Sequence, residues 1–243
     1  MKSAKRTLLL TALLFTINTS IAQPFMEWYD SIQVKIGASD LVNPWAGGLN
    51  FVQASNIDMN MDGVKDLFMF DKTGDKIRTF INTGTAGAVD YKYDPYYETK
   101  FPKNLHDWTL LVDYNCDGKE DIFSYSDIAG GFKVYRNTST VSTGLQFTLV
   151  TPLQYSIFNP PGTTLINLYV SNADIPAISD IDNDGDLDVV TFGLGASYME
   201  YHKNMSMELY GTCDSLKFQM ANRCWGYASE HPMNNNYTLF DTC

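Results

Sequence analysis

Three short apolar runs along this chain have the composition of β-strands. They are Leu67–Phe70, Ile122–Tyr125 and Val189–Phe192, and each begins directly after an acidic segment. β-branched and aromatic residues of this kind favour strands. A second apolar segment precedes each acidic segment, at Phe51–Ile57, Leu110–Val112 and Ile175–Ser179. The pattern therefore predicts the same local structure three times: a strand, a polar loop and a second strand.

The similarity between the three units extends beyond the polar loop. An Asn lies 24 residues after the first Asp of each acidic segment, and a ring side chain precedes that Asn by two residues. These pairs are Phe80 and Asn82, Tyr135 and Asn137, and His202 and Asn204. A short turn, such as Asp71–Lys76 or Ser126–Gly131, follows the second strand. We therefore expect a third strand in each unit that ends at the Asn.

Each acidic segment is a copy of one ten-residue phrase. The copies read DMNMDGVKDL at Asp58–Leu67, DYNCDGKEDI at Asp113–Ile122 and DIDNDGDLDV at Asp180–Val189. Oxygen-bearing side chains occupy positions 1, 3, 5 and 9, and Gly at position 6 permits a sharp turn. The backbone carbonyl of position 7 adds a further oxygen. The candidate metal ligands are Asp58, Asn60, Asp62, Val64 and Asp66; Asp113, Asn115, Asp117, Lys119 and Asp121; and Asp180, Asp182, Asp184, Asp186 and Asp188.

This set of donors is typical of a calcium site. Ca²⁺ takes six to eight oxygen ligands in flexible geometry, whereas Mg²⁺ demands tight octahedral geometry and keeps its waters. An EF-hand would place Glu at position 12, but the chain has Met69, Ser124 and Thr191 there. Acidic turns that bind nothing are the other alternative, because Asp, Asn and Gly favour turns. Three copies of one pattern argue against that alternative, and we expect up to three structural Ca²⁺ ions.

The three units resemble the FG-GAP or VCBS repeats of integrin-α-type β-propellers, of the kind found in secreted bacterial proteins. The resemblance rests on the D-x-[ND]-x-D-G-x-x-D-hydrophobic phrases, on the strand before each, and on Pro176-Ala177 ahead of the third. It covers about Asn43 to Asn204 and is a strong repeat signature. It implies that each phrase caps a blade hairpin and holds structural Ca²⁺, and that ligands bind at other loops, often on the opposite face.

The expected fold is all-β: a β-propeller with three recognisable blades, each with a calcium-loop hairpin. The blades occupy residues 23–204, with hairpin units at about 43–82, 101–137 and 165–204. Residues 205–243 form a cysteine-containing extension or the start of a further blade. Propellers close with four to eight blades, so three phrases predict an incomplete propeller. Either degenerate blades flank the three, or the chain belongs to a longer protein, which we favour.

The first 22 residues have the features of a secretory signal. Lys2, Lys5 and Arg6 precede the apolar stretch Thr7–Ile17, and Ser20-Ile21-Ala22 forms a small-residue cleavage site. The apolar stretch is too short to span a bilayer, and we expect no membrane span after cleavage. The sequence thus predicts a protein that is secreted or lies on the cell surface, with residues 1–22 as its signal peptide.

The charge balance narrows the choice of partner. The chain has 28 Asp and Glu against 17 Lys and Arg, a net charge of −11, and 12 of the acids lie in the three phrases. Much of the negative charge is therefore local, where metal ions can neutralise it. Nucleic-acid binding needs a basic face, so the expected partner is an unknown extracellular protein or glycan. The extra residues between the second and third phrases, around Thr138–Gly144 or Pro160-Pro161, form a candidate binding loop.

The four cysteines suggest a disulfide. Cys116 occupies position 4 of the second phrase, and Cys213, Cys224 and Cys243 follow the last unit. Disulfides are expected in an exported chain, although four cysteines allow three connectivities and the sequence does not choose between them. Cys213–Cys224 is our preferred pair. The chain has no C-x-x-C motif for redox catalysis and lacks the ligand spacing of a zinc site.

These observations leave three functions to weigh. The favoured one is an extracellular calcium-binding module, without enzymatic activity, that serves as a rigid scaffold for adhesion or for binding a protein or glycan. The second is a carbohydrate-active enzyme, a lyase or hydrolase on a propeller scaffold, whose two carboxylates could come from distant loops. Against it, no nucleophile motif is recognised, and His106, His202 and His231 lie in unrelated contexts. The third is a purely structural segment of a larger surface protein.

Overall fold

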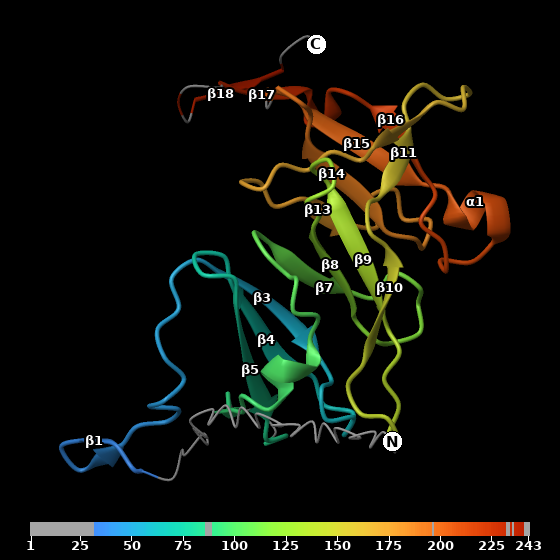
Figure 1. Ribbon diagram of the computed structural model, residues 1–243. Helices are drawn as coiled ribbons and strands as arrows, with labels where there is room; N and C mark the ends of the chain where they lie inside the picture. The colour runs from blue at the N-terminus through green and yellow to red at the C-terminus, as the bar shows by residue number, and fades with distance from the viewer. Residues whose placement is uncertain (1–31, 86–88, 196, 232–233, 235, 241–243) are drawn as a thin grey trace, which may run out of the picture. The chain divides into compact units, whose positions relative to one another are not determined.

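The computed structural model describes residues 32–85, 89–195, 197–231, 234 and 236–240 (Figure 1). These residues form an all-β structure in which strands far outnumber helical segments. The strands discussed below belong to one compact unit, Gln33–Cys243. The predicted secretory signal, Met1–Ala22, lies outside the described residues.

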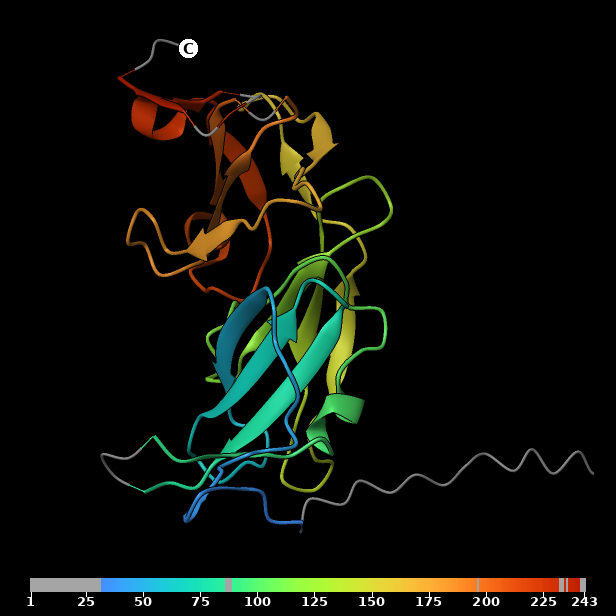
Figure 2. The same ribbon diagram turned by 90° about the vertical axis from the view of Figure 1, so that its left-hand side faces the viewer.

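The first sheet consists of four antiparallel strands in chain order. They are β3 (Val52–Ile57), β4 (Asp66–Asp71), β5 (Lys76–Asn82) and β6 (Tyr91–Tyr93). Figure 2 shows β3, β4 and β5 side by side, coloured blue to turquoise. The first acidic loop joins β3 to β4, and Ile57 at the end of β3 pairs with Asp66 at the start of β4. The predicted order of strand, loop, strand, turn and strand is confirmed here, and β5 ends at Asn82 as expected.

The second sheet repeats this arrangement. Its strands are β7 (Thr109–Val112), β8 (Asp121–Tyr125), β9 (Phe132–Asn137) and β10 (Phe147–Thr151), again antiparallel and in chain order. The second acidic loop joins β7 to β8. β9 ends at Asn137, so the second unit also follows the predicted pattern.

The third sheet contains the same four-stranded core with two strands added. The core is β13 (Ala177–Ser179), β14 (Asp188–Phe192), β15 (Met199–Asn204) and β16 (Phe218–Asn222). Strand β11 (Tyr155–Ile157) pairs in parallel with β16, and β12 (Leu165–Asn167) pairs antiparallel with β11. Because β16 lies within residues 205–243, part of the segment expected as an extension instead completes the third sheet.

The remaining elements are short. They are β1 (Lys35–Ile36) paired with β2 (Ser39–Asp40), β17 (Ala228–Glu230) paired with β18 (Tyr237–Leu239), the 3₁₀ helices η1 (Tyr97–Lys100) and η2 (Trp225–Tyr227), and the α-helix α1 (Ser206–Tyr210). Of these, α1 matters most for the acidic loops, because it follows β15 directly.

One face of the first sheet packs against the second sheet. Phe68 and Phe70 of β4 are fully buried and share a core cluster with Leu111 of β7 and Ile122 of β8. Residues two apart in a strand point to the same face, which explains why both phenylalanines enter this cluster. Phe101, which follows η1, adds an aromatic contact with its ring centroid 4.7 Å from that of Phe68.

The opposite face of the second sheet packs against the third sheet. Phe123 of β8 and Phe132 of β9 belong to a second core cluster together with Val189 and Phe218 of the third sheet. Successive residues of a strand point to opposite faces, so Phe123 enters this cluster while its neighbour Ile122 enters the other. The second sheet is thus covered on both faces.

The all-β part of the fold prediction is confirmed. Each sheet formed by the described residues is open. Two core clusters join the three sheets, one on each face of the second sheet. Four-stranded antiparallel sheets are the building unit of β-propellers, so this arrangement agrees with the predicted fold without closing a ring.

Substitution of Phe123 should be far more costly than substitution of an exposed residue in the same sheet. Phe123 is 0% exposed and Leu149 of β10 is 47% exposed. We expect Phe123→Ala to lower the free energy of unfolding by about 3–5 kcal/mol, because it leaves a cavity between two sheets. Leu149→Ala, the matched control, should cost less than about 1 kcal/mol. Urea denaturation measures both, and similar losses for the two variants would contradict the packing described.

Candidate metal sites

The first Asp of each phrase bends its loop into a tight turn. In the first loop, Asp58 accepts hydrogen bonds from the backbone N–H groups of Asp62 at 3.1 Å and Gly63 at 2.9 Å, one on each carboxylate oxygen. The corresponding distances are 3.3 and 2.8 Å in the second loop and 3.2 and 3.1 Å in the third. The three loops therefore have the same internal geometry.

Left-handed backbone at position 6 completes this turn. Gly63, Gly118 and Gly185 have φ of 86°, 84° and 104°, in the region where a side chain would be strained. Position 4 is also left-handed in all three loops, with φ of 60°, 58° and 62°. Only Asn among the residues found there adopts this conformation readily. The sequence motif does not signal position 4, because Met61 and Cys116 occupy it in the first two loops.

The ninth Asp of each phrase holds the loop to the end of the hairpin. Asp66 is fully buried, and its two oxygens accept from the backbone N–H groups of Met59 at 2.8 Å and Asn82 at 2.9 Å. Asp121 binds position 2 and the landmark Asn of its unit in the same way, at 3.1 and 2.7 Å. Asp188 repeats the arrangement at 3.0 and 2.8 Å. The ninth Asp thus has a structural role in addition to the predicted one as a ligand.

The landmark Asn has a physical explanation in the first two units. The side-chain amide of Asn82 donates to the carbonyl of Lys65 at 3.1 Å, and that of Asn137 donates to the carbonyl of Glu120 at 3.1 Å. Both carbonyls belong to position 8 of the phrase, so the Asn closes the loop from the other side of the ninth Asp. Asn204 differs, because its amide donates to the carbonyl of Ser215 at 3.0 Å.

Burial raises the pKa of all three ninth Asp residues. The pKa of Asp121 rises to about 7, and those of Asp66 and Asp188 rise as well. Backbone hydrogen bonds lower these pKa values and offset only part of the effect of burial. Burying an ionised carboxylate among other acids is unfavourable, and a cation in the loop would relieve that cost.

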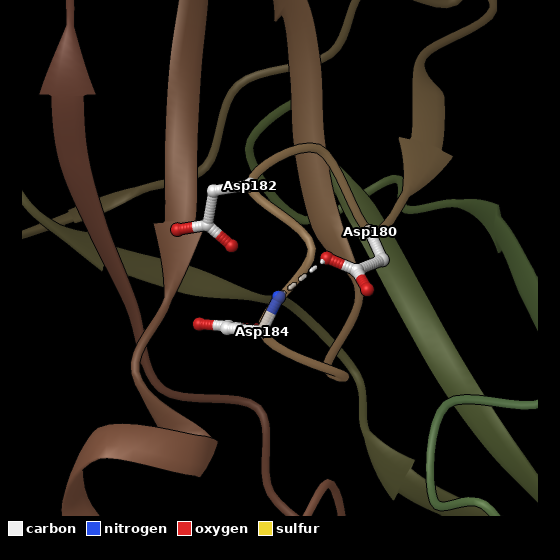
Figure 3. Close-up of side chains that lie close together, drawn as sticks. All are labelled: Asp180, Asp182 and Asp184. Atoms are coloured by element: carbon white, nitrogen blue, oxygen red, sulfur yellow. Dashed lines mark hydrogen bonds between the residues drawn. The ribbon is translucent and has the colours of Figure 1, made fainter.

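The third loop brings three carboxylates together. Asp180, Asp182 and Asp184 each offer an oxygen, and these oxygens lie within 4.8 Å of one another. Figure 3 shows the three side chains around the loop, with the N–H of Asp184 donating to Asp180. Oxygens this close can share one cation, because Ca²⁺–O distances are about 2.3–2.6 Å. The donor set therefore fits a hard metal ion.

The first two loops differ from the third at position 3. Asn60 donates its side-chain amide to Asp62 at 2.8 Å, and Asn115 donates to Asp117 at 3.3 Å. These amides reduce the repulsion that a third carboxylate would add. In all three loops the N–H of position 7 donates to the position 5 carboxylate, at 2.8, 2.9 and 3.1 Å. Position 7 therefore lies against the acidic residues, and its carbonyl remains a predicted ligand in Val64, Lys119 and Asp186.

Two charged residues beside the third loop carry no signal in the motif. The ammonium of Lys203 contacts the carboxylates of Asp182 and Glu208 and lies 3.2 Å from Asp184. These contacts raise the pKa of Lys203 well above its usual range. Glu208 comes from α1, so neither its spacing nor that of Lys203 could be read from the phrase. Both are found only once the chain after β15 is seen to fold back on the loop.

The three loops are neighbours in space. Lys65 of the first loop forms an ion pair with Glu120 of the second at 2.8 Å. The thiol sulfur of Cys116 in the second loop lies 3.8 Å from the carbonyl of Gly185 in the third. The corresponding ends of the three units therefore meet along one side of this compact unit.

The preferred disulfide pairing, Cys213–Cys224, is wrong. Cys213 is bonded to Cys116, with an S–S distance of 2.02 Å and a Cα–Cα distance of 6.1 Å. Cys224 is disulfide-bonded as well, but not to Cys213. The chain after α1 returns to the second loop, which places Cys213 beside a residue 97 positions earlier. Closeness along the chain was therefore a poor guide to closeness in space.

Comparison with protein-family models, with curated proteins and with solved structures gave no match to this chain. The class of protein is therefore defined by the structure itself: an all-β protein with acidic loops, one of which gathers carboxylates that could hold a metal ion. Among the described residues, no helix has both the length and the apolar character needed to cross a bilayer.

The raised pKa of Asp121 predicts how stability changes with pH when metal is absent. A carboxyl whose pKa is higher in the folded state binds its proton more tightly there, so stability is greatest at low pH and falls as pH rises. In EDTA we expect a loss on the order of 2 kcal/mol between pH 5 and pH 8, as Asp121 ionises through its folded pKa of about 7.

Urea denaturation at several pH values, in EDTA, measures this loss. Asp121→Asn should flatten the profile, because the amide does not ionise. Asp40→Asn, at an exposed carboxylate paired with Lys35, is the control and should leave the profile unchanged. A flat profile in the unmodified protein would show that Asp121 ionises as easily in the folded state as in the unfolded chain.

Loss of the Cys116–Cys213 disulfide should destabilise the protein. The bond closes a loop with a sequence separation of 97 residues. We expect Cys116→Ser with Cys213→Ser to lower the free energy of unfolding by about 2–4 kcal/mol, because the unfolded chain regains freedom. Peptide mapping without reductant checks the pairing directly. A peptide joining Cys213 to Cys224 would contradict the structure.

Proposed function

We propose that this protein is an extracellular calcium-binding β-propeller module that serves as a rigid scaffold for adhesion or for binding a protein or glycan. The observation that carries the proposal is the identical hydrogen bonding of the three acidic loops. Unrelated acidic turns would not share the curl at position 1, the glycine at position 6 and the buried ninth Asp.

Calcium is the ion that the donors favour. Each loop offers oxygen ligands from positions 1, 3, 5 and 9, and the carbonyl of position 7 adds another. A flexible set of this size suits Ca²⁺ better than Mg²⁺, which prefers fewer protein ligands and strict octahedral geometry. The ion would neutralise the acidic loops, which carry much of the net charge of −11.

The stacking of the sheets supports propeller blades. Each unit contains a four-stranded antiparallel sheet in chain order, and the second sheet contacts a neighbour on each face. The corresponding loops lie next to one another, as the Lys65–Glu120 ion pair indicates. Blades arranged around a common axis would produce both features. We therefore propose that the three sheets are consecutive blades.

Two features support an extracellular location. The predicted signal peptide, residues 1–22, would direct export. The Cys116–Cys213 disulfide is the kind of bond that persists in an oxidising compartment.

The bonding of the acidic residues favours a scaffold over a carbohydrate-active enzyme. Carboxylates at positions 1, 5 and 9 accept hydrogen bonds from backbone N–H groups of their own unit. Groups engaged in this way shape the loop and are poorly placed to transfer protons to a substrate. The dense acidic residues therefore support metal binding more strongly than catalysis.

Calcium should raise the melting temperature. For a site with Kd near ~10⁻⁴ M, about 2 mM Ca²⁺ adds roughly 1.8 kcal/mol. Three such sites would add about 5 kcal/mol, which corresponds to an increase of roughly 10–20 °C for a chain of this size. Thermal melts in Ca²⁺ and in EDTA measure the difference.

The control is the triple variant Asp58→Ala, Asp113→Ala and Asp180→Ala, which removes position 1 of each loop. Its melting temperature should no longer respond to Ca²⁺. A folded unmodified protein whose melting temperature is the same in Ca²⁺ and EDTA would show that the loops are ordinary acidic turns, and the carboxylates would again be candidates for catalysis.

A further inference from the structure

A second group of carboxylates adjoins the third loop. Asp184, Asp186 and Glu208 each offer an oxygen, and these oxygens lie within 4.8 Å of one another. We propose that they form a second cation site, which shares Asp184 with the loop site and takes a hard divalent ion such as Ca²⁺. This site is additional to the three loop sites, in which Asp186 contributes only its backbone carbonyl and Glu208 takes no part.

The side chain of Asp186 points to a missing ligand. It is 1% exposed, and one of its oxygens, Oδ2, accepts from the backbone N–H of Met207 at 2.8 Å. The other oxygen, Oδ1, is buried without a hydrogen-bond partner. A buried carboxylate oxygen that gives up water without gaining a partner is costly. A cation bound between Asp184, Asp186 and Glu208 would supply that partner.

The distances suit one ion. Two ligands on opposite sides of a Ca²⁺ ion lie about 4.8 Å apart, since each Ca²⁺–O distance is about 2.4 Å. Three oxygens within 4.8 Å of one another can therefore all reach the same ion. The side chain of Glu208 is 35% exposed, so the site opens to solvent on that side. Water can complete the coordination there, and the ion can enter by the same route.

The nearby lysine does not complete the cluster by itself. Lys203 contacts Asp182, Asp184 and Glu208, and so brings one positive charge to these three carboxylates and Asp186. With the ammonium in this position, Oδ1 of Asp186 still has no partner. Lys203 therefore competes with the proposed ion for two of its three ligands, and leaves the third unsatisfied.

Only the third unit can build this site. Position 7 is Val64 in the first loop and Lys119 in the second, and neither side chain can bind a cation. The helix α1 follows β15 directly and brings Glu208 to the loop, held there by the bond between Met207 and Asp186. The third loop thus differs from the other two both in its own sequence and in the segment packed on it.

The number of bound calcium ions tests the proposal. The metal-free protein is dialysed against ⁴⁵CaCl₂, and bound Ca²⁺ per chain is counted in saturating ion. Glu208→Gln and Asp186→Asn should each reduce the count by one. Asp214→Asn is the matched control, because this carboxylate lies in the same segment but pairs with Arg136, and it should leave the count unchanged.

A second set of variants separates this site from the loop site. Asp180→Asn should remove the third loop's ion and leave the proposed ion bound, so that the double variant with Glu208→Gln loses two. Lys203→Met should bind the proposed ion at a several-fold lower Ca²⁺ concentration, because it removes the competing ammonium. This variant keeps the test valid even if Asp186→Asn fails to fold.

The outcomes distinguish this proposal from the proposed function. A protein that binds Ca²⁺ but keeps the full count in Glu208→Gln, with no gain in affinity in Lys203→Met, overturns the second site alone. A folded protein that binds no Ca²⁺ at all overturns both proposals. A count that falls by one in Glu208→Gln and is unchanged in Asp214→Asn supports the site.

Discussion

The structure depends on a buried carboxylate with two backbone partners. In each unit the ninth Asp of the acidic phrase accepts one N–H from the start of its loop and one from the Asn that ends the hairpin. These two bonds fix the length of the hairpin, which explains why the first Asp and the Asn are always 24 residues apart. They also place a negative charge where burial makes it unfavourable, as the raised pKa of Asp121 shows. The geometry that shapes the loop thus creates the need for a cation.

The third unit meets this need differently from the other two. Asn60 and Asn115 lower the charge of the first two loops and donate to the neighbouring Asp. The third loop has Asp182 at that position and a fifth acid, Asp186, and Lys203 and α1 pack against it. One ammonium offsets only part of this charge. The extra acids and the helix that covers them occur together, which suggests that they form one device and that the third loop is the most demanding of the three for metal.

The local structure of this chain could be predicted from its sequence, and the long-range contacts could not. Runs such as Ile122–Tyr125 identify strands because their composition and spacing are local properties. The acidic phrase likewise locates each loop. By contrast, nothing local indicates that β16 returns to β15, that Glu208 reaches the third loop, or that Cys213 meets Cys116. Each of these contacts depends on how the segment after Asn204 folds back. The double role of the ninth Asp was hidden for another reason, because a ligand and a buried acceptor are the same residue type.

The Cys116–Cys213 bond also determines how the protein would respond to tension. A force that stretches the chain from both ends passes through the disulfide and bypasses the segment between the two cysteines, which includes most of the second and third sheets. With a sequence separation of 97 and about 3.4 Å per extended residue, roughly 330 Å of contour length is withheld from extension. The third acidic loop and its helix lie inside this protected segment. They would keep their geometry under loads that pull the first sheet apart.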